Sequence, residues 1–346
     1  MGKILLFAHD PGGANAISPL IEALKNNGHE LFVYAKGPAI SKIPQAVELK
    51  SENIQNFLKE LAPDFILTGT SANDFTEKYL WRAAKNMNIK SMAFLDHWIN
   101  YGIRFSKYGL KDIQKYNKNK SFDFLPDYIC VMDDFAKQEM IKEGIPEKII
   151  YSFGNPHFES LKKQIKLEDI EKIRSKFIKK GEDFIITFAS EPYTEDYGLG
   201  NEKQVLRDLQ DIITKIDKKI SLVVKLHPKE ELSKYSEFEY LYIEKETNSI
   251  DMIMASDLII SMTSMVLIEA MILDKNILSY QPNETNINKF ILTRNKFLDF
   301  INKKEDLESK IKLQILNNQN RKNSFELKKD SIYNIVKFLE NNLCRN

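Results

Sequence analysis

The sequence predicts an α/β protein of two tandem domains, each built on a doubly wound parallel sheet. Three observations lead to this fold class. The chain has 346 residues, which exceeds the usual size of one domain. Short apolar runs alternate with amphipathic stretches, as strands alternate with crossover helices in a parallel sheet. The alternation pauses in a charged, helix-prone segment and then starts again.

The first domain is expected over residues 1–157. "KILLFAH" is typical of an opening strand, and "AISPLIEALKNNG" of the helix after it. "ELFVYAK", "FILTGT", "SMAFLD" and "YICVMD" continue the series, with "EKYLWRAAKNMN" as one intervening helix. "IIYSFGNP" closes the domain, and residues 158–181 are expected to be a linker rather than part of a core.

The second domain is expected over residues 182–325, with strands in "FIITFAS", "SLVVKLHP", "YLYIEK", "LIISMTS" and "NILSYQ". Residues 326–346 contain "SIYNIVKFLENNL", which predicts a terminal helix packing across the domains. Two such domains in tandem predict a cleft that both face, with ligands at the carboxyl ends of the strands.

Composition narrows the function classes. The formal net charge is +1, so no global field favours nucleic acid. Cys130 and Cys344 are the only cysteines, which gives neither a disulfide framework nor a metal-ligand set. No signal peptide or membrane-spanning run is visible. We expect a soluble cytoplasmic protein, and peripheral association with the inner face of the membrane stays open.

Polar residues follow the strands of the first domain. In "HDPGGANAI", Gly12 and Gly13 let the backbone approach a ligand, and the helix start after Asp10 favours an anion or a hydroxyl-rich partner. The alternative is that Asp10 only caps the helix. The glycine spacing is wrong for a dinucleotide fingerprint, and "ELFVYAK" ends in Lys36 where that fingerprint needs an acid.

Two later stretches add candidates to the same domain. "TGTSAND" could line a sugar pocket or cap a helix, and capping is the simpler role. "LDHWINYGIRF" combines carboxylate, imidazole, aromatic and guanidinium groups, which is typical of sugar recognition, although its aromatics could equally anchor a core. The candidate acceptor-binding residues are Gly12, Gly13, Asn15, Thr70, Asp96, His97, Trp98 and Arg104.

In the second domain, the strand "SLVVKLHP" ends at His227, because Pro228 cannot continue the ladder. A histidine at a strand exit can donate to a phosphate oxygen, with Lys225 beside it. Ordinary strand termination is the alternative.

The strand "LII" leads into Ser261, Thr263 and Ser264, and the helix that follows carries Glu269. Three hydroxyls and the N–H groups of a helix start form a phosphate cradle. A helix-capping serine would explain only one of the three. Glu191, after "FIITFAS", could bind a ribose diol or be a solvated loop charge.

Together these motifs resemble glycosyltransferases of the GT-B fold, which have two Rossmann-like domains. His227-Pro228 with Ser261, Thr263 and Ser264 is similar to the motifs of bacterial sialyl-, polysialyl- and Kdo transferases, and to the CDP site of CDP-glycerol glycerophosphotransferases. In those families the motifs hold the phosphate of a cytidine nucleotide. The acidic motif that carries the sialyltransferase base has no clean counterpart here, and Asp10 before a glycine pair is the nearest match.

The resemblance implies an inverting, metal-independent transfer from a CMP-linked sugar, such as a nonulosonic acid or Kdo, to a glycan, lipid-linked or protein hydroxyl, as in bacterial surface glycan synthesis. Asp10 would be the general base, with Asp96 and His97 in reserve. His227 would stabilise the departing phosphate. No cofactor is implied besides the nucleotide-sugar. The alternatives are a CDP-polyol phosphotransferase, a UDP-sugar 2-epimerase and a non-catalytic nucleotide-sugar-binding protein.

Overall fold

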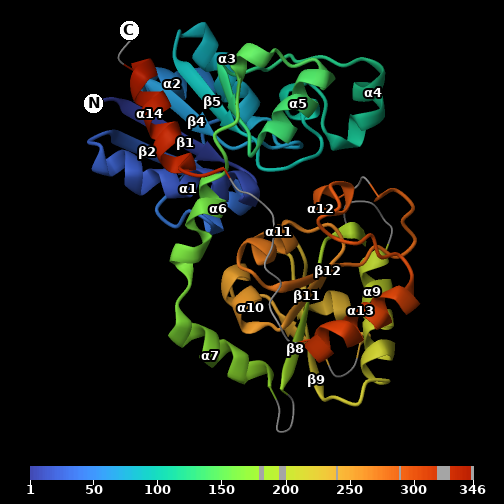
Figure 1. The fold of residues 1–346 in the computed structure, drawn as a ribbon. Coiled ribbons are helices and arrows are strands. Elements are labelled where there is room, and N and C mark those ends of the chain that lie inside the picture. The colour runs from blue at the N-terminus through green and yellow to red at the C-terminus, as the bar shows by residue number, and fades with distance from the viewer. Residues whose placement is uncertain (179–182, 195–199, 239–240, 288–289, 318–327, 344–346) are drawn as a thin grey trace. The chain divides into compact units, whose positions relative to one another are not determined.

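The computed structural model describes residues 1–178, 183–194, 200–238, 241–287, 290–317 and 328–343. These residues divide into two compact units (Figure 1). Unit 1 contains residues 1–160 and the C-terminal helix, and unit 2 begins at Leu161. Cys344 and parts of the predicted linker and tail (179–181, 326–327 and 344–346) lie outside the described residues.

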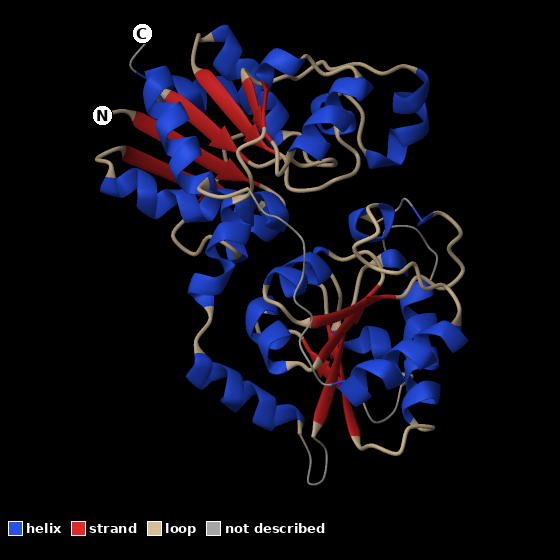
Figure 2. Cartoon of the chain, in the orientation of Figure 1, coloured by secondary structure: helices blue, strands red, loops and turns tan. Residues whose placement is uncertain are grey.

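Unit 1 is built on a seven-stranded parallel sheet with the order β3-β2-β1-β4-β5-β6-β7. Figure 2 draws the strands in red and the helices in blue. The order reverses between β1 and β4, which makes their carboxyl ends the expected ligand position. The strands are β1 (Lys3–Ala8), β2 (Glu30–Ala35), β3 (Val47–Glu48), β4 (Phe65–Thr68), β5 (Lys90–Phe94), β6 (Tyr128–Cys130) and β7 (Ile150–Tyr151).

Successive residues of β1 point to opposite faces of the sheet, and both faces are covered. Ile4 and Leu6 pack on the face covered by α1 and α14, whereas Leu5 and Phe7 pack on the face covered by α2 and α3. The helices are α1 (Pro11–Asn26), α2 (Ile54–Leu61), α3 (Thr76–Asn86), α4 (Ile113–Lys118), α5 (Asp134–Glu143), α6 (Pro156–Ser160) and α14 (Ser331–Leu343). Short 3-10 turns are η1 (Gly37–Ser41), η2 (Gly102–Phe105), η3 (Leu110–Asp112) and η4 (Glu147–Ile149).

Unit 2 has a five-stranded parallel sheet with the order β10-β9-β8-β11-β12, which reverses between β8 and β11. Its strands are β8 (Phe184–Ala189), β9 (Ile220–Lys225), β10 (Tyr242–Glu244), β11 (Leu258–Ser261) and β12 (Asn276–Ser279). Its helices are α7 (Leu167–Phe177), α9 (Asn201–Ile213), α10 (Ser249–Ala255), α11 (Met265–Ile272), α12 (Ile291–Arg294) and α13 (Lys304–Asn317), with the 3-10 turns η5 (Leu161–Gln164) and η6 (Leu232–Tyr235).

Two helices differ from the sequence expectation. The predicted linker contains α7, which packs Ile173 and Phe177 into the core of unit 2 and is not merely a connector. The C-terminal helix α14 packs against α1 and α6 of unit 1. Its buried face, including Ile335 and Leu339, completes the core on one side of the first sheet. In both cases an apolar helical face finds its partner within one unit.

Candidate functional site

In unit 1, the candidate residues gather where the sheet order reverses. Asp10 follows β1 as the N-cap residue of α1, and Thr70 follows β4. The two loops approach closely because glycine meets glycine: a Cβ on Gly13 would lie 2.8 Å from the Cα of Gly69. The first glycine-rich turn therefore sets the spacing between the two strand exits.

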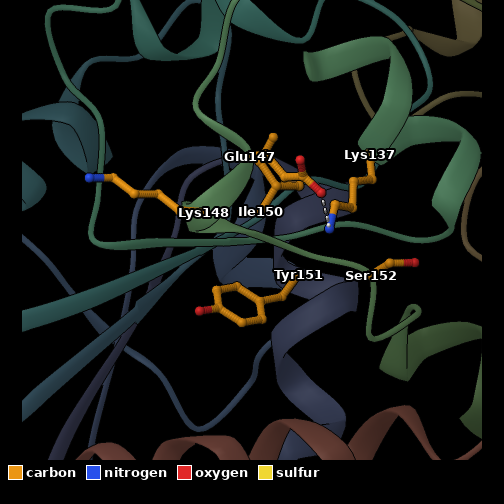
Figure 3. Close-up of a pocket in the computed structure, with 6 residues that line it drawn as sticks. All are labelled: Lys137, Glu147, Lys148, Ile150, Tyr151 and Ser152. Carbon is orange, nitrogen blue, oxygen red and sulfur yellow. Dashed lines mark ion pairs between the residues drawn. The ribbon is translucent and has the colours of Figure 1, made fainter.

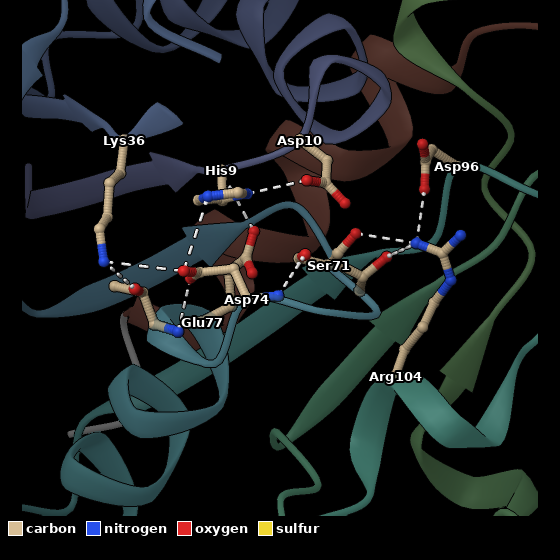
Figure 4. A network of polar contacts seen from close by, with 10 residues as sticks. His9, Asp10, Lys36, Ser71, Asp74, Glu77, Asp96 and Arg104 are labelled. Carbon is tan, nitrogen blue, oxygen red and sulfur yellow. Dashed lines mark hydrogen bonds and ion pairs between the residues drawn. The ribbon is translucent and has the colours of Figure 1, made fainter. Parts of the chain in front are cut away.

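A third strand exit joins them through Asp96, which follows β5. A Cβ on Gly12 would overlap the carboxylate of Asp96, so glycine lets this side chain reach the first turn of α1. Arg104 lies on η2, and its Nη1 is 3.2 Å from Asp96 Oδ1 (Figure 4). The same nitrogen donates to Thr70 O at 2.8 Å. Arg104 thus ties two of the strand exits together.

His9 also belongs to this candidate site, and the sequence analysis did not select it. It is the first residue after β1 and directly precedes Asp10. Its Nδ1 lies 2.8 Å from Asp10 Oδ1, and its Nε2 lies 3.6 Å from Asp74 Oδ2 (Figure 4). Lys36 is also 3.6 Å from Asp74. The backbone N–H of His9 donates to Glu77 Oε1 at 3.2 Å. His9 thus contacts three carboxylates, two through its imidazole and one through its backbone N–H.

The pKa values of the carboxylates near these strand exits shift in different directions. Burial works to raise the pKa of Asp10, but the hydrogen bond and the charge of His9 outweigh it and the pKa is lowered. Burial raises the pKa of Asp96, although Arg104 opposes it. Burial, reinforced by the charge of Asp10, raises the pKa of Glu77 well above its ordinary value. Asp10 is also the more accessible of the two loop carboxylates, with 36% of its side chain exposed against 14% for Asp96.

Two other predicted residues lie in less accessible positions. Trp98 is 1% exposed, its ring stacks on Phe158, and its Nε1–H donates to Asp133 at 2.8 Å. It is a packing residue in this structure, which matches the alternative of a core anchor. Burial lowers the pKa of His97 to about 3, so its ring is neutral and a poor proton acceptor at neutral pH. Asn15 lies half-buried on α1.

In unit 2, the exits of β8 and β11 are joined by Glu191. The carboxylate Oε2 accepts hydrogen bonds from the backbone N–H groups of Met262 and Thr263 at 3.1 and 2.8 Å. Its Oε1 accepts from Thr263 Oγ1 at 2.7 Å, and Ser261 Oγ lies 3.0 Å from Oε2. We call the donors of Ser261, Met262 and Thr263 the anion seat. Two of the three hydroxyls expected to cradle a phosphate, those of Ser261 and Thr263, therefore converge on one point, and the carboxylate of Glu191 lies there.

The remaining residues of this exit have separate roles. Ser264 is the N-cap of α11, and its hydroxyl accepts from Val266 N at 3.2 Å, so the helix-capping alternative accounts for this serine. Glu269 is buried on α11. Lys225 is buried too, and its ammonium donates to Lys245 O at 2.6 Å. Its charge is therefore directed at the backbone after β10.

Glu230, also missed from sequence, holds the turn of His227 and Pro228. It is fully buried, and its Oε2 accepts from the backbone N–H of His227 at 2.8 Å. Its Oε1 accepts from Ser190 Oγ at 2.7 Å and from Lys234 at 2.6 Å. Since Ser190 precedes Glu191 in the chain, these hydrogen bonds connect the exits of β8, β9 and β11. The imidazole of His227 is partly exposed beside them.

Three further observations concern the whole described chain. An open pocket of about 540 Å³ lies beside the edge strand β7, crossed by the ion pair of Lys137 and Glu147, and no predicted site residue lines it (Figure 3).

The described residues contain no group of three or more His, Cys, Asp or Glu side chains placed to hold a metal ion. None of the described helices is long and apolar enough to cross a membrane.

Comparison with solved structures defines the class of fold. S. aureus MnaA in complex with UDP is similar over 99% of this chain and 97% of its own, with 14% identity and a TM-score of 0.71. The UDP-GlcNAc 2-epimerase of Methanocaldococcus jannaschii, in complex with UDP-GlcNAc and UDP, is similar over 98% and 99%, with 17% identity and a TM-score of 0.69. The UDP-GlcNAc 2-epimerase of Neisseria meningitidis has 16% identity and a TM-score of 0.68 over 99% and 100%. The chain has the GT-B fold that the sequence predicted.

The family follows from the sequence match. Residues 100–304 match the CDP-glycerol:poly(glycerophosphate) glycerophosphotransferase family, and because this is more than half of the 346 residues, the chain belongs to that family. No curated protein matches it. The family is one of transferases, which agrees with the predicted reaction class at this coarse level. The matched range includes the His227 turn, Glu191 and the anion seat.

Proposed function

We propose that the protein is a transferase that binds a cytidine-nucleotide-activated donor in unit 2 and moves the activated group to an acceptor hydroxyl. A phosphopolyol carried by CDP is the first candidate, because the family is defined by CDP-glycerol. The second candidate is transfer of a CMP-activated acidic sugar, which the motif resemblance favours. Its support in the structure is that the anion seat holds one carboxylate group, and a donor with a single phosphate would need a seat of that size.

The observation that carries the proposal is the anion seat at the start of α11. Two backbone N–H groups and a threonine hydroxyl converge on one point, at the exit where the order of the second sheet reverses. Successive backbone N–H groups that point at one spot favour an anion such as phosphate, and ligands bind where the strand order of a parallel sheet reverses. His227, held by Glu230 at the neighbouring strand exit, is the second group proposed to stabilise the nucleotide phosphate.

In the proposed reaction, the acceptor oxygen attacks the β-phosphorus of the CDP-polyol. A P–O bond to the acceptor forms, the bond to the bridging oxygen breaks, and CMP leaves with the electron pair. For the acceptor proton, Asp10 of unit 1 is the general base that the family resemblance suggests. Its carboxylate is ionised at neutral pH, because the hydrogen bond and the charge of His9 lower its pKa despite burial. The anion seat and His227 stabilise the charge that develops on CMP.

The test is CMP release from CDP-glycerol in the presence of a polyol-phosphate acceptor, compared with CMP-sialic acid, CMP-Kdo and UDP-GlcNAc. We expect release from a cytidine donor only. Asp10→Asn should slow this release by about 10²- to 10⁴-fold, the usual contribution of a general base, while CDP affinity is unchanged. Turnover of UDP-GlcNAc would favour an epimerase, and cytidine binding without turnover of any donor would favour a binding protein.

A further inference from the structure

The anion seat is filled by an anion of the chain itself. The carboxylate of Glu191 accepts from three firm donors, which are the N–H groups of Met262 and Thr263 and the hydroxyl of Thr263. Ser261 Oγ lies within hydrogen-bond distance of both Glu191 and Ala189 O, and its single proton serves one of them at a time. A carboxylate and a phosphate oxygen are acceptors of the same kind, so the two groups require the same donors.

These donors are not needed to cap the helix. Ser264 already caps α11 through Val266 N, and the contacts to Glu191 lie one step earlier in the chain. Tyr193 adds a polar contact, because its hydroxyl lies 3.1 Å from Thr263 Oγ1. The seat is therefore a separate arrangement of donors, directed at the group that occupies it.

The occupant is held without an opposite charge. In the described part of the chain, the donors that contact the Glu191 carboxylate are neutral backbone N–H and hydroxyl groups. Burial raises the pKa of its carboxyl, although the hydrogen bonds of Thr263, Ser261 and Met262 oppose this. A charge whose desolvation is only partly compensated is easier to displace than a fully paired one.

We propose that Glu191 is an internal competitor for phosphate: its carboxylate fills the anion seat in the ligand-free chain and leaves the seat when the phosphate of the donor binds. This inference rests on the proposed function in taking the seat as a phosphate site. The Glu191 carboxylate and a phosphate cannot accept from the same N–H groups at once, and two negative charges placed side by side would repel each other. Glu191 thereby sets the affinity of unit 2 for its nucleotide and favours ligands that carry enough charge to displace it.

The experiment is calorimetric titration of the full chain with inorganic phosphate and, separately, with CDP. Glu191→Ala removes the competitor and should bind both probes about tenfold more tightly or better, which corresponds to about 1.4 kcal/mol. Glu191→Gln keeps the size of the side chain without its charge and should bind more tightly than the wild type as well. Circular dichroism confirms that each variant is folded.

The matched control is Asp183→Ala, which removes the same charge next to the opposite end of β8, where 72% of the side chain is exposed. Its affinities should equal those of the wild type. Unchanged or weaker phosphate binding by both Glu191 variants would overturn the inference. Tighter phosphate binding without CDP binding would support the inference and contradict the cytidine donor of the proposed function.

Discussion

At the scale of single residues, Lys78 is a buried cation that holds the loop carrying Arg104. It is fully buried on α3, and its ammonium donates to the carbonyl oxygens of Ile103, Ser106 and Tyr108 at 3.3, 2.9 and 3.2 Å. No carboxylate pairs with it within ion-pair distance in the described part of the chain. Burial lowers the pKa of Lys78 from 10.5 to about 8.

This shift predicts a pH dependence of stability. Between pH 8 and about 10.5 the unfolded chain holds the Lys78 proton more strongly than the folded chain, so this residue makes stability rise with pH across that window. In Lys78→Met the rise is absent. Urea unfolding at pH 7.5 and 9.5 measures it through tryptophan fluorescence, since both tryptophans, Trp81 and Trp98, lie in unit 1. An equal stability difference between wild type and variant at both pH values would contradict the prediction.

At the scale of elements, the first turn of α1 depends on Gly12 having no side chain. Alanine at a helical glycine normally stabilises by about 0.5–1 kcal/mol. Here its methyl would overlap the carboxylate of Asp96, which Arg104 holds in place, so we expect Gly12→Ala to destabilise unit 1 by about 1–3 kcal/mol.

Thermal unfolding measures this change, and Gly109→Ala is its control. A Cβ on Gly109 would lie 3.3 Å from its nearest neighbour, Asn73 Oδ1, a much milder contact than the overlap at Gly12, so Gly109→Ala should destabilise less than Gly12→Ala. If Gly12→Ala instead stabilised the protein, the Asp96 carboxylate would be able to move away from the first turn of α1 without cost, and the prediction would be wrong.

Much of this architecture was readable from the sequence, because apolar runs and their polar exits are local features. The sequence analysis placed candidate residues at the exits of β1, β4, β5, β8, β9 and β11, and the structure brings Ser261 and Thr263 together. The sequence did not indicate which strand exit supplies the group that contacts Ser261 and Thr263. Glu191 meets Thr263 across 72 residues, because β8 and β11 pair in the sheet. Trp98 is covered by Phe158, 60 residues later, which no local pattern indicates.

At the scale of the whole molecule, two parallel sheets each carry polar residues at the position where their strand order reverses. Unit 1 has its own core on both faces of its sheet, completed by α14, and unit 2 has its own core with α7 and α9. The assignment of the donor nucleotide depends on unit 2 alone, because the His227 turn, Glu191 and the anion seat all belong to it. It can therefore be tested without an acceptor.

The most direct test is calorimetric binding of CMP, CDP, UMP, UDP and GDP to the wild-type chain and to His227→Ala. We predict that the cytidine nucleotides bind more tightly than the others and that His227→Ala weakens their binding by about tenfold, the loss of one charge-assisted hydrogen bond. A preference for UDP, or cytidine binding that is unaffected by the substitution of His227, would contradict the assignment of the donor site.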